Sequence, residues 1–113
     1  MPPVTDAEEL KRFQGLLREW KFAGFIQWKR RAAEWLRENL SNRTQQGIGQ
    51  LIYEHRGEVQ QTAEIREDYR DRYRFHYDFR LFIDGQRVYI ETAFDCGATE
   101  SDSTIWVVNI KPA

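Results

Sequence analysis

The chain has 113 residues and a net charge of −1, and 41% of its residues are hydrophobic. This length predicts a single domain over residues 1–113, and the apolar content excludes an intrinsically disordered chain. The near-neutral charge excludes a general electrostatic attraction to nucleic acid or to a membrane. Residues 6–56 are predicted to form a helical part, and residues 57–113 an antiparallel sheet.

Cysteine usage and the N-terminal sequence bear on the location of the protein. Cys96 is the single cysteine, so no internal disulfide can form, which is typical of a reducing cytosol. The segment MPPVTDAEE lacks the basic and apolar character of a signal peptide. No apolar run approaches about 18 residues, so no transmembrane helix is expected. A cytoplasmic protein without membrane contact is predicted.

Three helices are predicted in the N-terminal half. Thr5 and Glu8 fit a capping box, followed by an amphipathic helix over about 6–21. A second helix is predicted over about 24–40. A third, shorter helix follows the polar link SNRTQQG, and Gly57 is expected to end it in a left-handed cap.

The predicted second helix is apolar over more than one stripe, and it carries two tryptophans seven residues apart. Trp28 and Trp35 would therefore lie on the same side of one helix. Two interpretations stay open: the tryptophans pack in the core, or they form an exposed seam for a partner. Trp28 and Trp35 are the candidate partner-binding residues.

The C-terminal half changes to the two-residue alternation of strands. A first strand is predicted over 59–66 and a second over 73–83. Asp84-Gly85 is a strong hairpin signal that leads into a third strand, and a last strand lies within IWVVNIK. The predicted fold class is α+β, with two or three N-terminal helices packed on one face of a four-stranded, mainly antiparallel sheet in the order of the sequence.

The hairpin register places a set of polar side chains on one face of this sheet. With Asp84-Gly85 as the loop, Phe79 lies opposite Ile90 and Asp78 opposite Glu91. The candidate catalytic residues on the polar face are His76, Asp78, Arg80, Tyr89 and Glu91. Like charges directly opposite each other are unfavourable, so a positive group, a metal or open water must offset the pair.

Three interpretations of this face stay open. It can be a solvated surface whose charges alternate. It can be an acid–base pair, because the negative charge of one carboxylate raises the pKa of a second carboxyl group beside it. It can hold a divalent cation between Asp78, Glu91 and His76. No zinc motif or phosphate-binding glycine loop is present, so no metal ligand is assigned and no cofactor is expected. The Glu-x-Lys of a restriction-type nuclease is also missing, since Thr92 and Ala93 follow Glu91.

The order of elements resembles the small ribonuclease-toxin fold of barnase, colicin-type and RelE-type nucleases. The local similarity lies in QGIGQLIYEHRGEV, where Gly-Ile opens a short helix that precedes a strand. The resemblance implies a metal-independent ribonuclease in which His76, Arg80, Arg66, Tyr89 and Glu91 aid attack of a ribose 2′-hydroxyl on its own phosphate.

The first functional hypothesis is a small interaction or regulatory domain that binds a protein partner or itself, without catalysis. Aromatic residues and arginines are frequent anchors of such interfaces. The alternative is a metal-independent, toxin-type ribonuclease that uses the polar sheet face, and a further alternative is a metal-assisted site at His76, Asp78 and Glu91. A protein partner is preferred over RNA, and whether the protein is an enzyme stays open.

Overall fold

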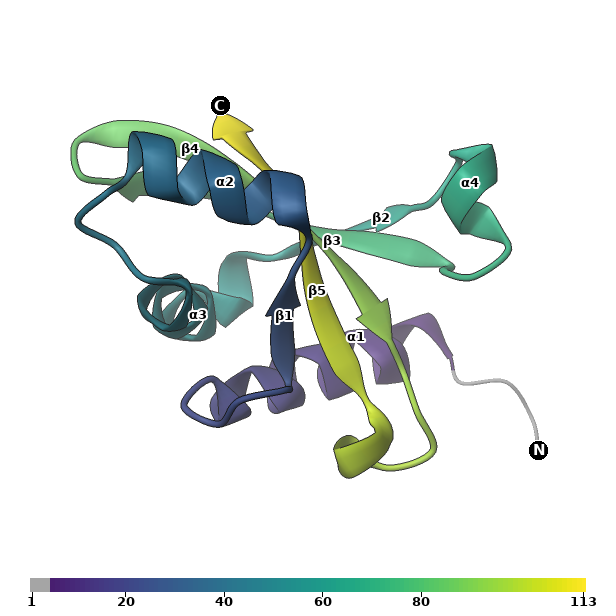
Figure 1. The fold of residues 1–113 in the computed structure, drawn as a ribbon. Helices are drawn as coiled ribbons and strands as arrows, with labels where there is room; N and C mark the ends of the chain where they lie inside the picture. Colours follow the sequence, from purple (N-terminus) through teal and green to yellow (C-terminus); the bar gives the residue numbers. More distant parts are fainter. Residues whose placement is uncertain (1–4) are drawn as a thin grey trace.

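A computed structural model describes residues 5–113, so the first four residues of the predicted domain lie outside the described residues. Its fold is α+β, with a five-stranded mixed sheet in the order β1-β5-β4-β3-β2 (Figure 1). The helices are α1 Asp6–Leu16, α2 Arg30–Asn39, α3 Gln45–Glu54 and α4 Glu67–Arg70; the strands are β1 Ile26–Trp28, β2 Gln60–Ala63, β3 Phe75–Ile83, β4 Gln86–Asp95 and β5 Thr104–Pro112. No helix within residues 5–113 is long and apolar enough to cross a membrane.

The central hairpin has the predicted register. Phe79 pairs with Ile90, and Asp78 pairs with Glu91, in the antiparallel β3–β4 ladder. Asp84 and Gly85 both take positive φ values, 52° and 81°, as a type I′ turn requires. The predicted order of the four C-terminal strands is also confirmed, because β2, β3, β4 and β5 neighbour one another in sequence order.

A fifth strand corrects the prediction of a four-stranded sheet. Residues Ile26–Trp28 pair in parallel with β5, with Ile26 opposite Ile105. The predicted helix over 24–40 is therefore wrong at its start, since the α-helix begins only at Arg30. The strand is three residues long and lies inside an apolar run, so its side chains alone do not separate strand from helix.

Helix and strand ends differ from the sequence patterns in three places. The helix predicted over 6–21 is α-helical to Leu16 and continues as a short 3₁₀ turn. Gly57 is not a left-handed cap, because it lies in a 3₁₀ turn and only Gly24 and Gly85 have positive φ among the described glycines. The strand predicted over 59–66 pairs only over Gln60–Ala63.

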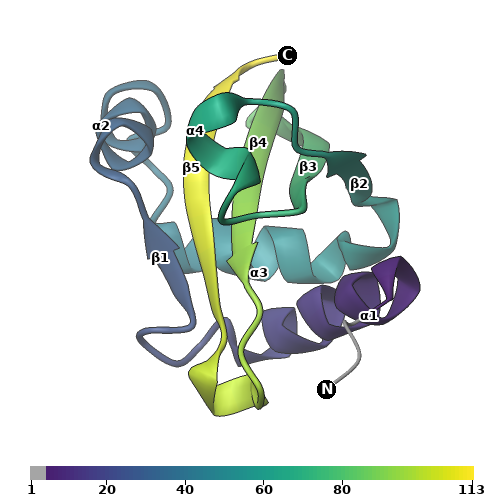
Figure 2. The same cartoon turned by 90° about the vertical axis from the view of Figure 1, so that its right-hand side faces the viewer.

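The core lies between the apolar sheet face and helices α1, α2 and α3, with Leu36 of α2 in the same buried cluster as Phe13 and Ile48. Phe13 of α1 stacks on Tyr77 of β3 with ring centroids 4.2 Å apart, a contact worth about 1 kcal/mol beyond burial. Figure 2 shows α4 on the opposite side of β4 and β5 from α1 and α3. The predicted packing of the N-terminal helices agrees with this shared core, to which α1, α2 and α3 all contribute buried residues. Helix α2 packs along β5, and α4 lies over the polar face.

Candidate functional site

Three potential metal ligands meet on the polar face of the central hairpin. His76 and Asp78 come from β3, and Glu91 from β4, because strand alternation turns them away from the core. One ligand atom from each side chain lies within 4.8 Å of the others. Asp78 is only 4% exposed and Glu91 only 5% exposed, so two carboxylates are held close together with little water.

A hydrogen-bond network holds Asp78 and orients His76. Nδ1 of His76 lies 2.7 Å from Oδ1 of Asp78, and the hydroxyl of Thr62 donates to Oδ2 at 3.2 Å. The Tyr89 side chain lies near enough to Asp78 for the charge of that carboxylate to act on its hydroxyl. Burial, followed by the negative charge of Asp78, raises the pKa of Tyr89, so the phenol stays protonated and able to donate a hydrogen bond.

Arg66 supplies the positive charge next to Glu91. Its guanidinium contacts the Glu91 carboxylate and grips Glu64 through two bonds, 2.8 Å from Nε to Oε1 and 2.9 Å from Nη2 to Oε2. The hydrogen bonds from Arg66 lower the pKa of Glu64 to about 2. Arg66, the residue before α4, thus supplies a positive charge that offsets the repulsion between the Asp78 and Glu91 carboxylates.

The structure brings four of the five predicted site residues together, namely His76, Asp78, Tyr89 and Glu91. Arg80 lies at the edge of the group, where it donates to Oε1 of Gln60 at 2.6 Å and covers the Tyr89 ring at 5.0 Å. The sequence interpretation did not single out Thr62 as a site residue. The signal was available, because Thr62 falls on the polar side of the alternation in the first predicted strand and pairs with His76.

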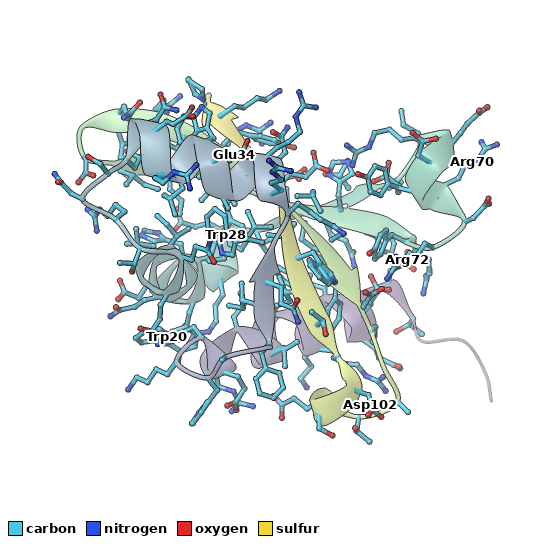
Figure 3. All side chains as sticks on the ribbon, viewed as in Figure 1. Trp20, Trp28, Glu34, Arg70, Arg72 and Asp102 are labelled. Atoms are coloured by element: carbon cyan, nitrogen blue, oxygen red, sulfur yellow. The ribbon has the colours of Figure 1, made fainter. Side chains whose placement is uncertain are left out.

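The two candidate partner-binding tryptophans do not form a helical seam. Trp28 lies in β1 and Trp35 in α2, and both are partly buried against the hydrophobic core. Figure 3 shows Trp28 between α2 and α3. Large hydrophobic side chains that are exposed within residues 5–113 are instead Phe22, Ile65 and Phe82, at 61%, 80% and 71%.

Comparisons of the chain with protein-family models, with curated proteins and with solved structures find no match.

Proposed function

We propose that the polar sheet face binds a divalent cation and hydrolyses a phosphate ester, with His76, Asp78 and Glu91 as the ligands. The observation that carries the proposal is the meeting of one imidazole and two nearly buried carboxylates within 4.8 Å. Arg66 compensates the charge of Glu91. A bound cation would also compensate the second buried carboxylate, Asp78, which contacts His76 and Thr62. A cation with borderline ligand preference, such as Mn²⁺ or Zn²⁺, suits one nitrogen and two carboxylate oxygens.

The groups around the three ligands suit an anionic substrate. A bound cation lowers the pKa of its water and polarises a phosphoryl oxygen. Arg66 lies against Glu91, and Lys111 of β5 pairs with Tyr89 of β4. These residues would place two positive side chains and a protonated phenol beside the reacting phosphate, where hydrogen bonds to developing charge accelerate hydrolysis.

Cation binding and hydrolysis are tested separately. The melting temperature should rise with Mn²⁺ or Zn²⁺, because a ligand that binds only the folded state stabilises it. Asp78→Asn and Glu91→Gln should each abolish this rise and the hydrolysis of bis(p-nitrophenyl) phosphate. Asp84→Asn, which removes a carboxylate at the exposed hairpin turn, is the matched control and should keep both. An unchanged melting temperature with every cation would sink the proposal.

A second candidate is the metal-independent ribonuclease of the toxin type. The contact of 2.7 Å between His76 and Asp78 favours it, because a carboxylate on Nδ1 orients an imidazole for acid–base work through Nε2. RNA cleavage that persists in EDTA and disappears in His76→Ala would support this candidate over the cation site. Cleavage that EDTA abolishes would support the cation site.

A protein-binding role without catalysis was the first expectation from the sequence. Its support now comes from the exposed side chains of Phe22, Ile65 and Phe82 rather than from the two tryptophans. Scattered exposed hydrophobics are common on protein surfaces, so this role ranks below the cation site. Self-association is tested by the solution mass of the wild type at high concentration against Phe82→Ser; an identical monomer mass for both removes it.

A further inference from the structure

A positively charged groove runs beside the cation-ligand cluster. Its volume is about 720 Å³, within the range of about 300–1,000 Å³ for ligand sites. The lining side chains come from α2 and its N-cap, from β5, and from α4 and its N-cap. Those with charge or aromatic rings are Lys29, Arg30, Arg31, Trp35, Arg66, Tyr69 and Lys111. No carboxylate is found among the described residues that line it, although the protein as a whole is slightly acidic.

The cations of the groove are available to an anionic ligand to different degrees. Arg30 pairs with Glu34, and Arg66 pairs with Glu64 and Glu91. Lys29, Arg31 and Lys111 are exposed and take part in no ion pair within residues 5–113. Three unpaired positive charges on one concave surface fit a ligand with several phosphates in a row.

Aromatic rings alternate with these cations. The ammonium of Lys29 lies 4.2 Å from the ring centroid of Trp106, and the guanidinium of Arg66 lies 4.7 Å from that of Tyr69. Tyr69 and Trp35 line the groove itself and are partly buried. Cationic grooves with interleaved rings bind single strands, because unpaired bases stack on the rings while the cations follow the phosphates.

The strand register connects the groove to the proposed cleavage site. Asn109, which lines the groove, pairs with Glu91, and Lys111 pairs with Tyr89. Arg66 lines the groove and contacts Glu91. A phosphate held by Arg66 and Lys111 would therefore lie next to the ligand cluster.

We infer that this groove binds single-stranded nucleic acid and presents one of its phosphodiesters to the cation site. The inference rests on the proposed function for its chemistry, but the binding itself needs no cation. It reverses the preference for a protein partner over RNA that the sequence patterns gave, because the positive charge is local and the net charge of −1 does not reveal it.

Binding is measured by fluorescence anisotropy in EDTA, with labelled oligonucleotides of about 12 nucleotides: oligo-U RNA, oligo-dT DNA and a DNA duplex of equal length. The triple variant Lys29→Glu/Arg31→Glu/Lys111→Glu should bind single strands at least about tenfold more weakly. The slope of log K against log salt concentration should also fall in magnitude by about 2, because each of three lost phosphate contacts contributes about 0.7. The matched control reverses three exposed cations outside the groove, Lys11→Glu/Lys21→Glu/Arg37→Glu, with the same change in net charge.

A second variant tests stacking without a change in charge. Tyr69→Ala should weaken single-strand binding by at least about fivefold, with an unchanged salt slope. Tighter binding of RNA than of DNA, or the reverse, shows whether the ligand carries ribose or deoxyribose. Either result supports the inference that the groove binds single strands. Equal losses in the groove and control triples, or a duplex bound as tightly as the single strands, would overturn the inference.

Failure of the groove and failure of the cation site are distinguishable. Oligonucleotide binding in EDTA reports on the groove alone, whereas the cation-dependent rise in melting temperature reports on the ligand cluster alone. If the rise is present and no oligonucleotide binds, the groove inference is wrong and the cation site stands. If oligonucleotides bind and no cation stabilises the protein, the proposed hydrolysis is wrong and the groove stands.

Discussion

Asp78 lies directly opposite Glu91 in the β3–β4 ladder, and both side chains are almost completely buried. Two facing carboxylates of this kind destabilise a sheet, so the fold retains an arrangement that a hydrophobic pair would improve. Arg66 and His76 each contact one of the two carboxylates. A buried pair of carboxylates that lowers the stability of the fold and contacts several polar side chains is typical of a functional site rather than of a structural element.

Removal of Arg66 should make stability depend on a cation. Arg66→Gln takes the positive charge from Glu91 and Glu64, so the free energy of unfolding should fall by about 1–3 kcal/mol without metal, as expected when a partly buried ion pair loses one member. Mn²⁺ should recover much of this loss, because the cation no longer competes with the guanidinium for Glu91. Urea unfolding with and without Mn²⁺ measures the effect.

Arg80→Gln is the matched control for this variant. Arg80 lies on the same face but donates to Gln60 rather than to Glu91, so its loss should be small and independent of Mn²⁺. An Arg66→Gln variant that loses equal stability in both conditions would speak against a cation at Glu91.

A buried contact between α1 and β3 predicts a second stability effect. The Tyr77 hydroxyl donates to the carboxylate of Glu9, which is 8% exposed, and Gln61 donates to the same hydroxyl at 3.1 Å. Tyr77→Phe leaves a buried carboxylate without this donor, so unfolding free energy should fall by about 1–3 kcal/mol. Glu9→Gln in the Tyr77→Phe background should recover part of the loss, because a neutral amide is less costly to bury than a charge. No recovery in urea unfolding would place the cost in ring packing instead.

The sequence predicts the hairpin and its polar face because local chemistry determines both. Asp84-Gly85 defines the turn, and the turn then determines every pair from His76–Ala93 to Ile83–Gln86. Strand alternation turns Asp78 and Glu91 to the same face without any tertiary information. The cluster could therefore be named before its geometry was known.

The remainder of the fold depends on contacts between residues far apart in the sequence. Ile26 becomes a strand residue because it pairs with Ile105, and nothing within its own apolar run indicates that partner. Arg66 reaches Glu91 because the chain turns over the polar face at α4. The groove is lined by residues of α2, β5 and α4, so no single stretch of the sequence predicts it.

The hairpin turn gives a backbone test with a control in the same chain. Gly85 has φ +81°, and a Cβ added there would meet no atom within 4 Å, so Gly85→Ala changes only the conformational energy. It should cost about 1 kcal/mol, the penalty for an L-residue in the left-handed region. Gly57 also has open space but no positive φ, so Gly57→Ala should be neutral or slightly stabilising. Equal effects of both substitutions in urea unfolding would contradict the turn assignment.

An ion pair at the same turn predicts a pH dependence. Arg43, in the link between α2 and α3, grips the Asp84 carboxylate at 2.9 Å through Nη2 and 3.3 Å through Nε. The hydrogen bond from Arg43 lowers the pKa of Asp84, so this pair stabilises the folded state at pH values above the unfolded pKa of aspartate, about 3.9. The contribution is lost as pH falls through the lower pKa of the folded state.

Asp84→Asn isolates the charge, because asparagine also tolerates the positive φ of 52° at this position. Wild type should be slightly more stable than Asp84→Asn between about pH 5 and pH 8, and the difference should shrink below about pH 4. It should also shrink at high salt, since both side chains are more than a third exposed. Denaturant midpoints across this pH range measure it, and Arg43→Gln should remove the difference at every pH. A difference that persists in the Arg43→Gln background would assign the effect to the turn conformation rather than to the ion pair.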